Sequence, residues 1–330
     1  MNARLWVFIG ALVSGLFLVP LTSDAQQPAK IPRVGFLATG PVPTPAAPYP
    51  LLQLFLEGLA GLGHVEGRDF IIEARFAEGR IERLPELAAD LVRLNVDVIA
   101  LAGAVTARAA KKATTSIPIV FVMVVDPVAD NVVASLERPG GNVTGITSFD
   151  PRQPRRQLEL LKEALPGLKR VAILGDRGVS DALLKANEEE ARALGLQPQG
   201  LKMGGPSPDF EGAFATARKE GVDAVLLLEE PIVFFNRKRI PQLAASNRLP
   251  TMVPGDWADV GGLIAYGTTL LDGAGRMAAY VDKILKGTKP GDLPVEVLTR
   301  YRLTINLKTA REIGVTIPPE VLKRADKVIE

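Results

Sequence analysis

No cysteine occurs in this 330-residue chain, and histidine occurs once, as His64. Without cysteine there can be no disulfide, no thiolate metal ligand, no cysteine nucleophile and no lipid attachment at a mature N-terminal cysteine. A lone histidine argues against a multi-histidine metal site and against a conventional Ser-His-Asp triad. Its neighbours Gly63 and Gly67 predict a surface turn. We therefore expect no catalytic residue, no metal and no cofactor.

An excess of either charge is also lacking. The 39 Lys and Arg residues and the 37 Asp and Glu residues leave a formal net charge of +2 at pH 7. Such a balance provides no strong field to attract nucleic acid or an anionic membrane, and we expect neither as a partner. Hydrophobic residues make up 47% of the chain, which is enough for a large core, and the length suggests two domains of ordinary size.

The apolar run near the start is too short to span a membrane. It extends over residues 5–19, whereas a membrane-spanning helix needs ~20 residues. Arg4 precedes the run, and the small residues Ser23 and Ala25 follow it, as in a secretory signal peptide. We therefore predict that residues 1–25 are a signal peptide cleaved after Ala25, and that the protein is periplasmic.

Strand and helix patterns alternate through the rest of the chain. The strand candidates are nearly continuous apolar runs, which indicates parallel sheets covered on both faces. The pattern restarts near residue 155, so we predict an α/β protein with two doubly wound parallel-sheet lobes joined by a multi-strand hinge. The first lobe comprises residues 31–147 plus about 268–299, and the second comprises 150–266 plus about 301–330. The predicted crossings lie near 146–150, 266–269 and 298–302. The predicted helices include 130–136, 180–194 and 232–246, and the predicted strands include 117–125.

Ligands of parallel sheets bind at the carboxyl ends of the strands. Small residues at these ends let a ligand reach backbone N–H groups, which suits a carboxylate; they are Thr39, Gly40, Gly103, Ala104 and Thr106. Carboxylates at these ends can bind an ammonium group; they are Asp126, Asp176, Glu229, Glu230 and Asp256. Together the two kinds of residue suit a zwitterion such as an amino acid. As an alternative, the threonines and aspartates are helix caps or turn residues, and the glutamates are solvated.

Aromatic residues are only 5% of the chain, so their positions are informative. Phe149, Trp257 and Tyr266 lie at predicted strand ends or crossings, where each can stack on an apolar or aromatic ligand. Core packing is the alternative for Phe149. Phe234 and Phe235 lie within a predicted helix, and we expect them in the core.

Several segments taken together resemble a known family. They are residues 33–37 (RVGFL), 62–67 (LGHVEG), 83–88 (RLPELA), 115–121 (TSIPIVF), 126–128 (DPV), 138–145 (RPGGNVTG), 305–310 (INLKTA) and 317–319 (IPP). With them the chain, from about residue 31 to 330, is similar to solute-binding proteins of bacterial ABC transporters, in the branch that includes tryptophan and phenylalanine binders. The chain departs from that branch at Ala104, where relatives often carry threonine, and at Val125, where they often carry glycine.

The resemblance implies a type I periplasmic-binding-protein fold, whose two lobes close on a small-molecule solute by hinge bending. It also implies a permease and an ATPase on separate chains, a monomeric protein, and a pocket that includes Thr39, Gly40 and the loop 103–106. Two other functions stay open. One is a sensory module that hands its ligand to a membrane receptor. The other is a secreted α/β enzyme that uses Glu229, Glu230 and Asp256.

Overall fold

The computed structural model describes residues 30–148, 150–177, 180–204, 208–255 and 257–330. Residues 31–330 form one compact unit. The predicted leader and its cleavage site lie outside the described residues, as do Phe149 and Asp256. Within the described residues, no helix is long and apolar enough to cross a membrane.

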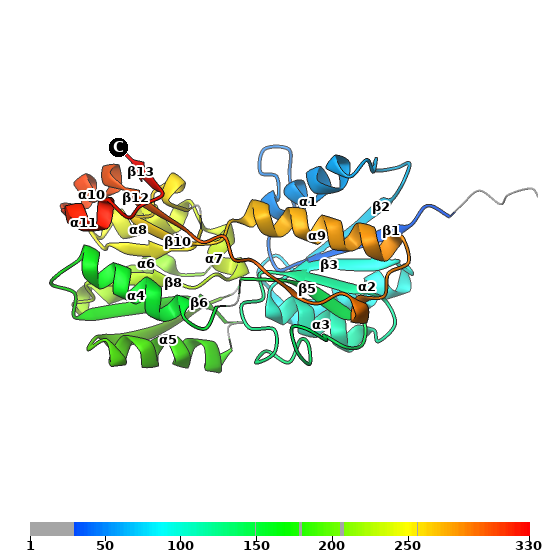
Figure 1. Ribbon diagram of the computed structural model, residues 1–330, viewed down its shortest axis with the longest axis horizontal. Helices are drawn as coiled ribbons and strands as arrows, with labels where there is room; N and C mark the ends of the chain where they lie inside the picture. Colours follow the sequence, from blue (N-terminus) through cyan, green and yellow to red (C-terminus); the bar gives the residue numbers. More distant parts are fainter. Residues whose placement is uncertain (1–29, 149, 178–179, 205–207, 256) are drawn as a thin grey trace, which may run out of the picture. The chain divides into compact units, whose positions relative to one another are not determined.

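The first lobe is a parallel six-stranded sheet with its covering helices (Figure 1). Its strands, in the order β11-β5-β4-β3-β1-β2, are β1 (Arg33–Ala38), β2 (Ile71–Phe76), β3 (Val98–Ala102), β4 (Ile119–Val122), β5 (Val143–Thr147) and β11 (Glu296–Val297). Its helices are α1 (Pro50–Gly61), α2 (Leu84–Arg93), α3 (Ala104–Ala113) and α9 (Leu270–Leu285), with short 3-10 turns η1 (Ile81–Arg83) and η3 (Pro290–Asp292).

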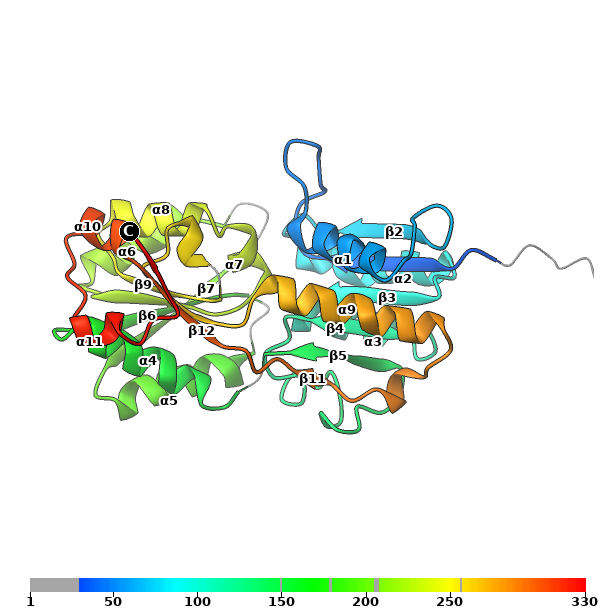
Figure 2. The same cartoon turned by 45° about the horizontal axis from the view of Figure 1, so that its top comes forward.

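Successive side chains of β1 point to opposite faces of this sheet. Phe36 packs with α1 and α9, which lie side by side over one face (Figure 2). Leu37 packs with α2 and α3 over the other face. This alternation on a strand that is apolar throughout explains why the sequence indicated a sheet buried on both sides.

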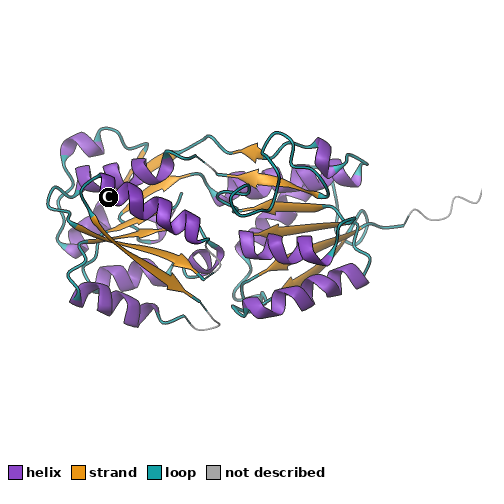
Figure 3. Ribbon diagram, turned by 90° about the horizontal axis from the view of Figure 1, so that it is seen from below, coloured by secondary structure: helices purple, strands orange, loops and turns teal. Residues whose placement is uncertain are grey.

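The second lobe is a seven-stranded sheet with its helices (Figure 3). Its strands, in the order β13-β12-β10-β9-β8-β6-β7, are β6 (Arg170–Asp176), β7 (Gln197–Met203), β8 (Ala224–Leu227), β9 (Thr251–Val253), β10 (Ile264–Gly267), β12 (Arg302–Asn306) and β13 (Lys327–Ile329). Its helices are α4 (Gln153–Ala164), α5 (Asp181–Ala193), α6 (Phe210–Lys219), α7 (Pro231–Phe235), α8 (Arg239–Ser246), α10 (Leu307–Ile313), α11 (Pro319–Leu322) and the 3-10 turn η2 (Trp257–Val260).

This second sheet is parallel except between β10 and β12, which run antiparallel. The two strands can pair in this way because the chain leaves the second lobe after β10 and returns at β12. In both sheets the strand order reverses once, between β1 and β3 and between β6 and β8. Such reversals open a crevice at the carboxyl ends of the strands, where ligands of α/β proteins bind.

The chain passes between the lobes three times. It crosses between β5 and α4, between β10 and α9, and between β11 and β12. These stretches overlap the crossings expected from the sequence. One hydrophobic cluster contains residues of both sheets, including Phe36 of β1 and Leu174 of β6.

Two predicted helices are wrong. Residues 130–136 form turns, because Asn131 has a left-handed φ of 56° and the N–H groups of Val132 and Val133 both bond to the carbonyl of Pro127. The predicted helix 232–246 is divided into α7 and α8, with residues 236–238 between them. The predicted strand 117–125 is shorter than expected, because Met123 also has a positive φ, of 55°.

Candidate functional site

A cavity of about 330 Å³ opens at the carboxyl ends of the strands and is lined by both lobes. The first lobe contributes three residues of the loop after β4, which are Val125, Asp126 and Ala129. The segment that crosses into the second lobe contributes Asp150 and Pro151, and the second lobe itself contributes α4, α5 and the end of β8. The cavity therefore lies where a ligand would contact both lobes together.

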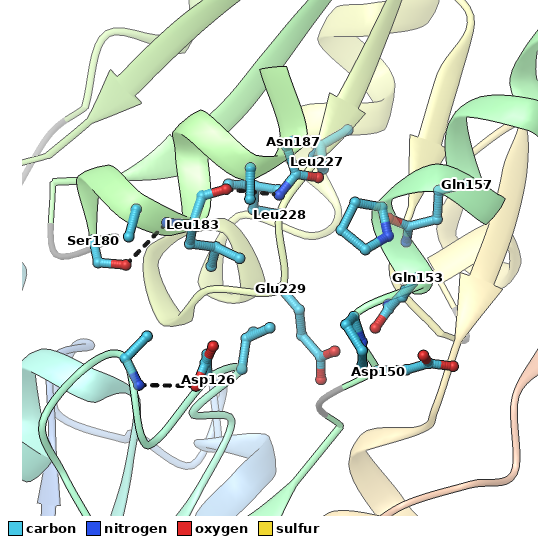
Figure 4. A pocket seen from close by; sticks show the side chains of 16 residues that line it. Asp126, Asp150, Gln153, Gln157, Ser180, Leu183, Asn187, Leu227, Leu228 and Glu229 are labelled. Carbon is cyan, nitrogen blue, oxygen red and sulfur yellow. Dashed lines mark hydrogen bonds between the residues drawn. The ribbon is translucent and has the colours of Figure 1, made fainter. Parts of the chain in front are cut away.

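Asp126 and Glu229 are the sequence-predicted residues that line this cavity. Asp126 has a structural role as well, because its Oδ1 accepts hydrogen bonds from the N–H groups of Val128 (3.2 Å) and Ala129 (2.9 Å). Glu229 follows β8, and its Oε2 accepts a hydrogen bond of 3.0 Å from the Ser148 hydroxyl, just after β5. Each acid thus follows a strand, as the sequence predicted, and the carboxylate of Glu229 lies between those of Asp126 and Asp150 in Figure 4.

Asp150 is a third carboxylate of the cavity. It bonds to Arg152, whose guanidinium lies 3.1 Å away and is largely exposed. The hydrogen bond from Arg152 holds the pKa of Asp150 below its usual range, so this carboxylate is ionised at neutral pH. Among the described lining residues there is no lysine or arginine.

Asp130 adds a further acid next to the cavity. It is buried, and its carboxylate accepts a 3.3 Å bond from Arg108. The side chain of Ser180, the N-cap of α5 in the other lobe, acts to lower the pKa of Asp130. Burial raises the pKa of Asp130 even though the Arg108 charge acts in the opposite direction. The loop after β4 therefore brings two acids toward the second lobe.

Amide side chains line the second-lobe wall. The Nε2 group of Gln157 donates a 3.0 Å hydrogen bond to the carbonyl of Tyr266. Asn187, in the middle of α5, is only 1% exposed, and its Nδ2 donates a 2.9 Å bond to the carbonyl of Leu183 (Figure 4). Its Oδ1 atom accepts no hydrogen bond from the described residues. A buried acceptor without a donor is costly.

Thr39 and Gly40, the predicted ligand contacts after β1, are not among the residues that line this cavity. A Cβ built on Gly40 would meet the ring of Phe235 at 2.6 Å, so a larger residue would require that ring to move, and the side chain beside this loop is Phe235 of α7. The Tyr49 ring packs on Phe235 as well, with centroids 4.8 Å apart. Ligand contact at Gly40 and its neighbour Thr39 stays a prediction.

The loop after β3 forms the start of α3. Gly103 has a φ of 85° and is the residue before the helix, whereas Ala104 and Thr106 are buried in its first turn. The hydroxyls of Thr106 and Thr39 are buried and have no hydrogen-bond partner within the described residues. Ligand contact at this loop also remains a prediction.

The remaining predicted residues are distributed around the second lobe. Glu230, buried at the start of α7, and Trp257, which packs edge-on against Phe234, border a smaller cavity that also touches Glu229. Tyr266 stacks on Tyr301 with centroids 5.6 Å apart. Asp176 ends β6, where its backbone pairs with Met203. Phe149 and Asp256 lie outside the described residues.

Sequence reasoning missed the amide side chains of the cavity. Gln153 and Gln157 lie in α4, whose buried residues also include Leu158 and Leu161. Asn187 could have been found from the sequence, because its spacing places it on the same helical face as Leu183 and Ala191, which is the buried face of α5. A polar residue in an apolar stripe is buried either with a partner or toward a site.

Comparison with known proteins identifies the family. A family model described as ABC transporter substrate binding protein matches residues 46–329. A tyrosine-binding protein of Clostridioides difficile (strain R20291) is 22% identical over 260 residues, which cover 78% of this chain and 75% of that protein.

Solved structures share the fold. A conserved domain protein of Vibrio cholerae has a TM-score of 0.80 and 27% identity, over 91% of this chain and 100% of that chain. An ABC domain of Streptococcus pneumoniae, solved in complex with L-Trp, has a TM-score of 0.76 and 26% identity, over 90% and 100% of the two chains. Because the family model matches most of its length and these structures share its two-lobed α/β fold, the chain belongs to the family of ABC transporter substrate-binding proteins.

Proposed function

We propose that this protein is the extracytoplasmic solute-binding component of an ABC uptake transporter. In this role it captures a small organic solute between its lobes and delivers it to the permease, without chemical conversion. The observation that carries the proposal is the cavity of about 330 Å³ lined by both lobes. A ligand in this position favours closure, because only the closed arrangement lets it contact both walls together.

An amino acid or a related aromatic compound is the solute class that the relatives favour. One relative is named a tyrosine-binding protein, and a structural neighbour holds L-Trp. The cavity has a size typical of small-molecule sites and a largely apolar lining with a few polar groups. We further propose that residues 1–25 direct export and are removed after Ala25, and that the lobes comprise residues 31–147 with 268–299 and 150–266 with 301–330.

A thermal-shift screen tests the capture role. The purified protein is refolded from denaturant to remove any retained solute, and is then melted with amino acids, aromatic acids, sugars and polyamines. A ligand that binds the folded state adds about 2.7 kcal/mol to the free energy of unfolding at a ligand concentration of 100 Kd, and the melting temperature therefore rises. We expect one chemical class to stabilise the protein and to remain chemically unchanged after incubation.

Two results would contradict the proposal. Turnover of the bound compound would indicate an enzyme instead. Absence of any shift across the panel, with a protein shown by circular dichroism to have refolded, would remove the support for solute capture.

A further inference from the structure

The polar groups that line the cavity are mostly hydrogen-bond acceptors. Asp126, Asp150 and Glu229 supply carboxylates, and none of the described lining residues carries a positive charge. Two of the donors that line it are already used within the protein, since Gln157 donates to the carbonyl of Tyr266 and Asn187 donates to the carbonyl of Leu183. The cavity is therefore suited to a ligand that donates hydrogen bonds and carries a positive charge.

The Asn187 amide supports this independently of the carboxylates. Asn187 lines the cavity, and its Oδ1 atom is buried and accepts no hydrogen bond within the described part of the chain. The orientation of the amide is set by the carbonyl of Leu183, to which Nδ2 donates at 2.9 Å. The reversed amide would place two acceptors against each other, so the oxygen is the atom left over.

Burial of such an acceptor costs about 1–3 kcal/mol unless a donor reaches it. Leucine or alanine at this position of α5 would avoid the cost, as its neighbours Leu183 and Ala186 do on the same wall. A donor supplied by the bound solute recovers the cost only when the solute is present. The residue thereby adds selectivity for solutes that carry an N–H or O–H group, because those that lack it leave the acceptor unsatisfied.

We propose that the solute of this cavity is a protonated amine, attracted by Asp126 and Glu229, with one of its N–H groups donated to Asn187 Oδ1. The inference rests on the proposed capture function and narrows its solute class. In this proposal the ammonium group contributes most of the affinity. An amine without a carboxylate therefore binds, whereas a carboxylic acid of the same shape without an amine does not. Like charges face such an acid on the wall formed by both lobes.

The wild-type protein tests the proposal with three matched compounds by titration calorimetry. They are L-phenylalanine, phenethylamine, which lacks the carboxylate, and 3-phenylpropionate, which lacks the amine. We expect phenylalanine and phenethylamine to bind, and 3-phenylpropionate to bind at least 100-fold more weakly than phenethylamine. If the acid binds as tightly as the amine, or if none of the three binds, the proposal is overturned.

Two variants then locate the recognition. Asp126→Asn removes the charge but keeps an oxygen that accepts from the N–H groups of Val128 and Ala129, so the turn is preserved. We expect it to weaken phenethylamine binding about 10-fold or more and to leave 3-phenylpropionate binding no weaker. A merely structural role of Asp126 would weaken both compounds alike, and that result would overturn its assignment.

Asn187→Leu removes the acceptor, and we expect it to weaken phenethylamine binding about 10- to 100-fold, as for a hydrogen bond to a charged group. Asn247→Leu is the matched control, because Asn247 Nδ2 makes the same bond to the carbonyl four residues earlier, Leu243, at 2.8 Å. Unchanged binding by a folded Asn187→Leu protein would overturn the role of Asn187. If that variant does not fold, the three-compound series still decides.

The two proposals fail in different ways. Binding of the acid alone, or of another solute without an amine, overturns the amine inference and leaves solute capture intact. Failure of every compound in the wider thermal-shift panel overturns both.

Discussion

Asp282 joins α9, the last helix of the first lobe, to the turn that follows α1. The carboxylate, in α9, accepts a 2.6 Å bond from His64, in the turn after α1, and a 2.8 Å bond from Lys286. His64 lies in the predicted surface turn, but its side chain is only 19% exposed because it pairs with Asp282. Burial acts to raise the pKa of Asp282, but the hydrogen bonds from Lys286 and His64 outweigh it and hold the pKa below its usual range.

The Asp282→Asn substitution should therefore lower stability in a pH-dependent way. A depressed carboxyl pKa stabilises the folded state above the unfolded pKa of about 3.9, and the stabilisation is lost as the pH falls through the folded value. We expect the variant to lose about 1–2 kcal/mol of unfolding free energy at pH 7, and much less near pH 3. Urea unfolding at both pH values measures this, with the exposed Asp292→Asn as control. A loss that does not change with pH would contradict the role of the charge.

At the scale of elements, Gly58 allows α1 and α9 to pack closely, because it has no side chain at their contact. A Cβ built on Gly58 would lie 2.8 Å from the Cβ of Ala278, nearer than real Cβ contacts allow. Gly61, at the end of the same helix, would meet nothing within 4 Å. Glycine is unfavourable in helices by about 1 kcal/mol relative to alanine, so the two positions should respond to alanine with opposite signs.

We expect Gly58→Ala to lower the unfolding free energy by about 1–3 kcal/mol through overpacking, and Gly61→Ala to leave it unchanged or to raise it by up to about 1 kcal/mol. Denaturant midpoints of the two variants, compared with the wild type, measure the difference. Equal effects of the two substitutions would show that α1 can shift away from α9 at little cost.

At the scale of the whole molecule, three crossing segments join the two lobes, and Tyr301 contacts residues of all three. It lies on the crossing between β11 and β12, its ring stacks on Tyr266 at the end of β10, and its hydroxyl donates a 2.7 Å bond to the carbonyl of Ser148 after β5. Burial, together with the nearby carboxylates of Asp150 and Glu229, raises the pKa of Tyr301 far above its usual value. The hydroxyl therefore stays protonated and continues to donate at neutral pH.

Tyr301→Phe keeps the stacked ring and removes only the bond to Ser148. We expect a broader distribution of distances between spin labels placed on the two lobes, measured in the ligand-free protein, because two crossings are no longer joined. Tyr280→Phe is the control, since the Tyr280 hydroxyl makes the same 2.7 Å bond, to Pro294, within the first lobe. Identical distributions for both variants and the wild type would show that the lobes are positioned without this bond.

The sequence by itself determined the α/β class, the alternation of strands and helices, and two acids of the cavity. These follow from local rules: an apolar run of strand length is buried on both faces, and a residue that follows a parallel strand lies at the ligand-binding edge. Asp126 and Glu229 were found in this way. The family resemblance was readable for the same reason, because it rests on short contiguous segments.

Only the tertiary structure decided which side chains meet. Gly40 follows β1 as a ligand contact should, yet the ring beside it comes from Phe235, nearly two hundred residues later in the sequence. Asn187 lies within an ordinary helical stripe, and the acids that line the cavity with it, Asp126 and Glu229, come from distant parts of the chain. The short strand β5, with Gly145 within it, pairs with β4 and with β11, which lies much later in the sequence. Such contacts join distant residues, so no local periodicity contains them.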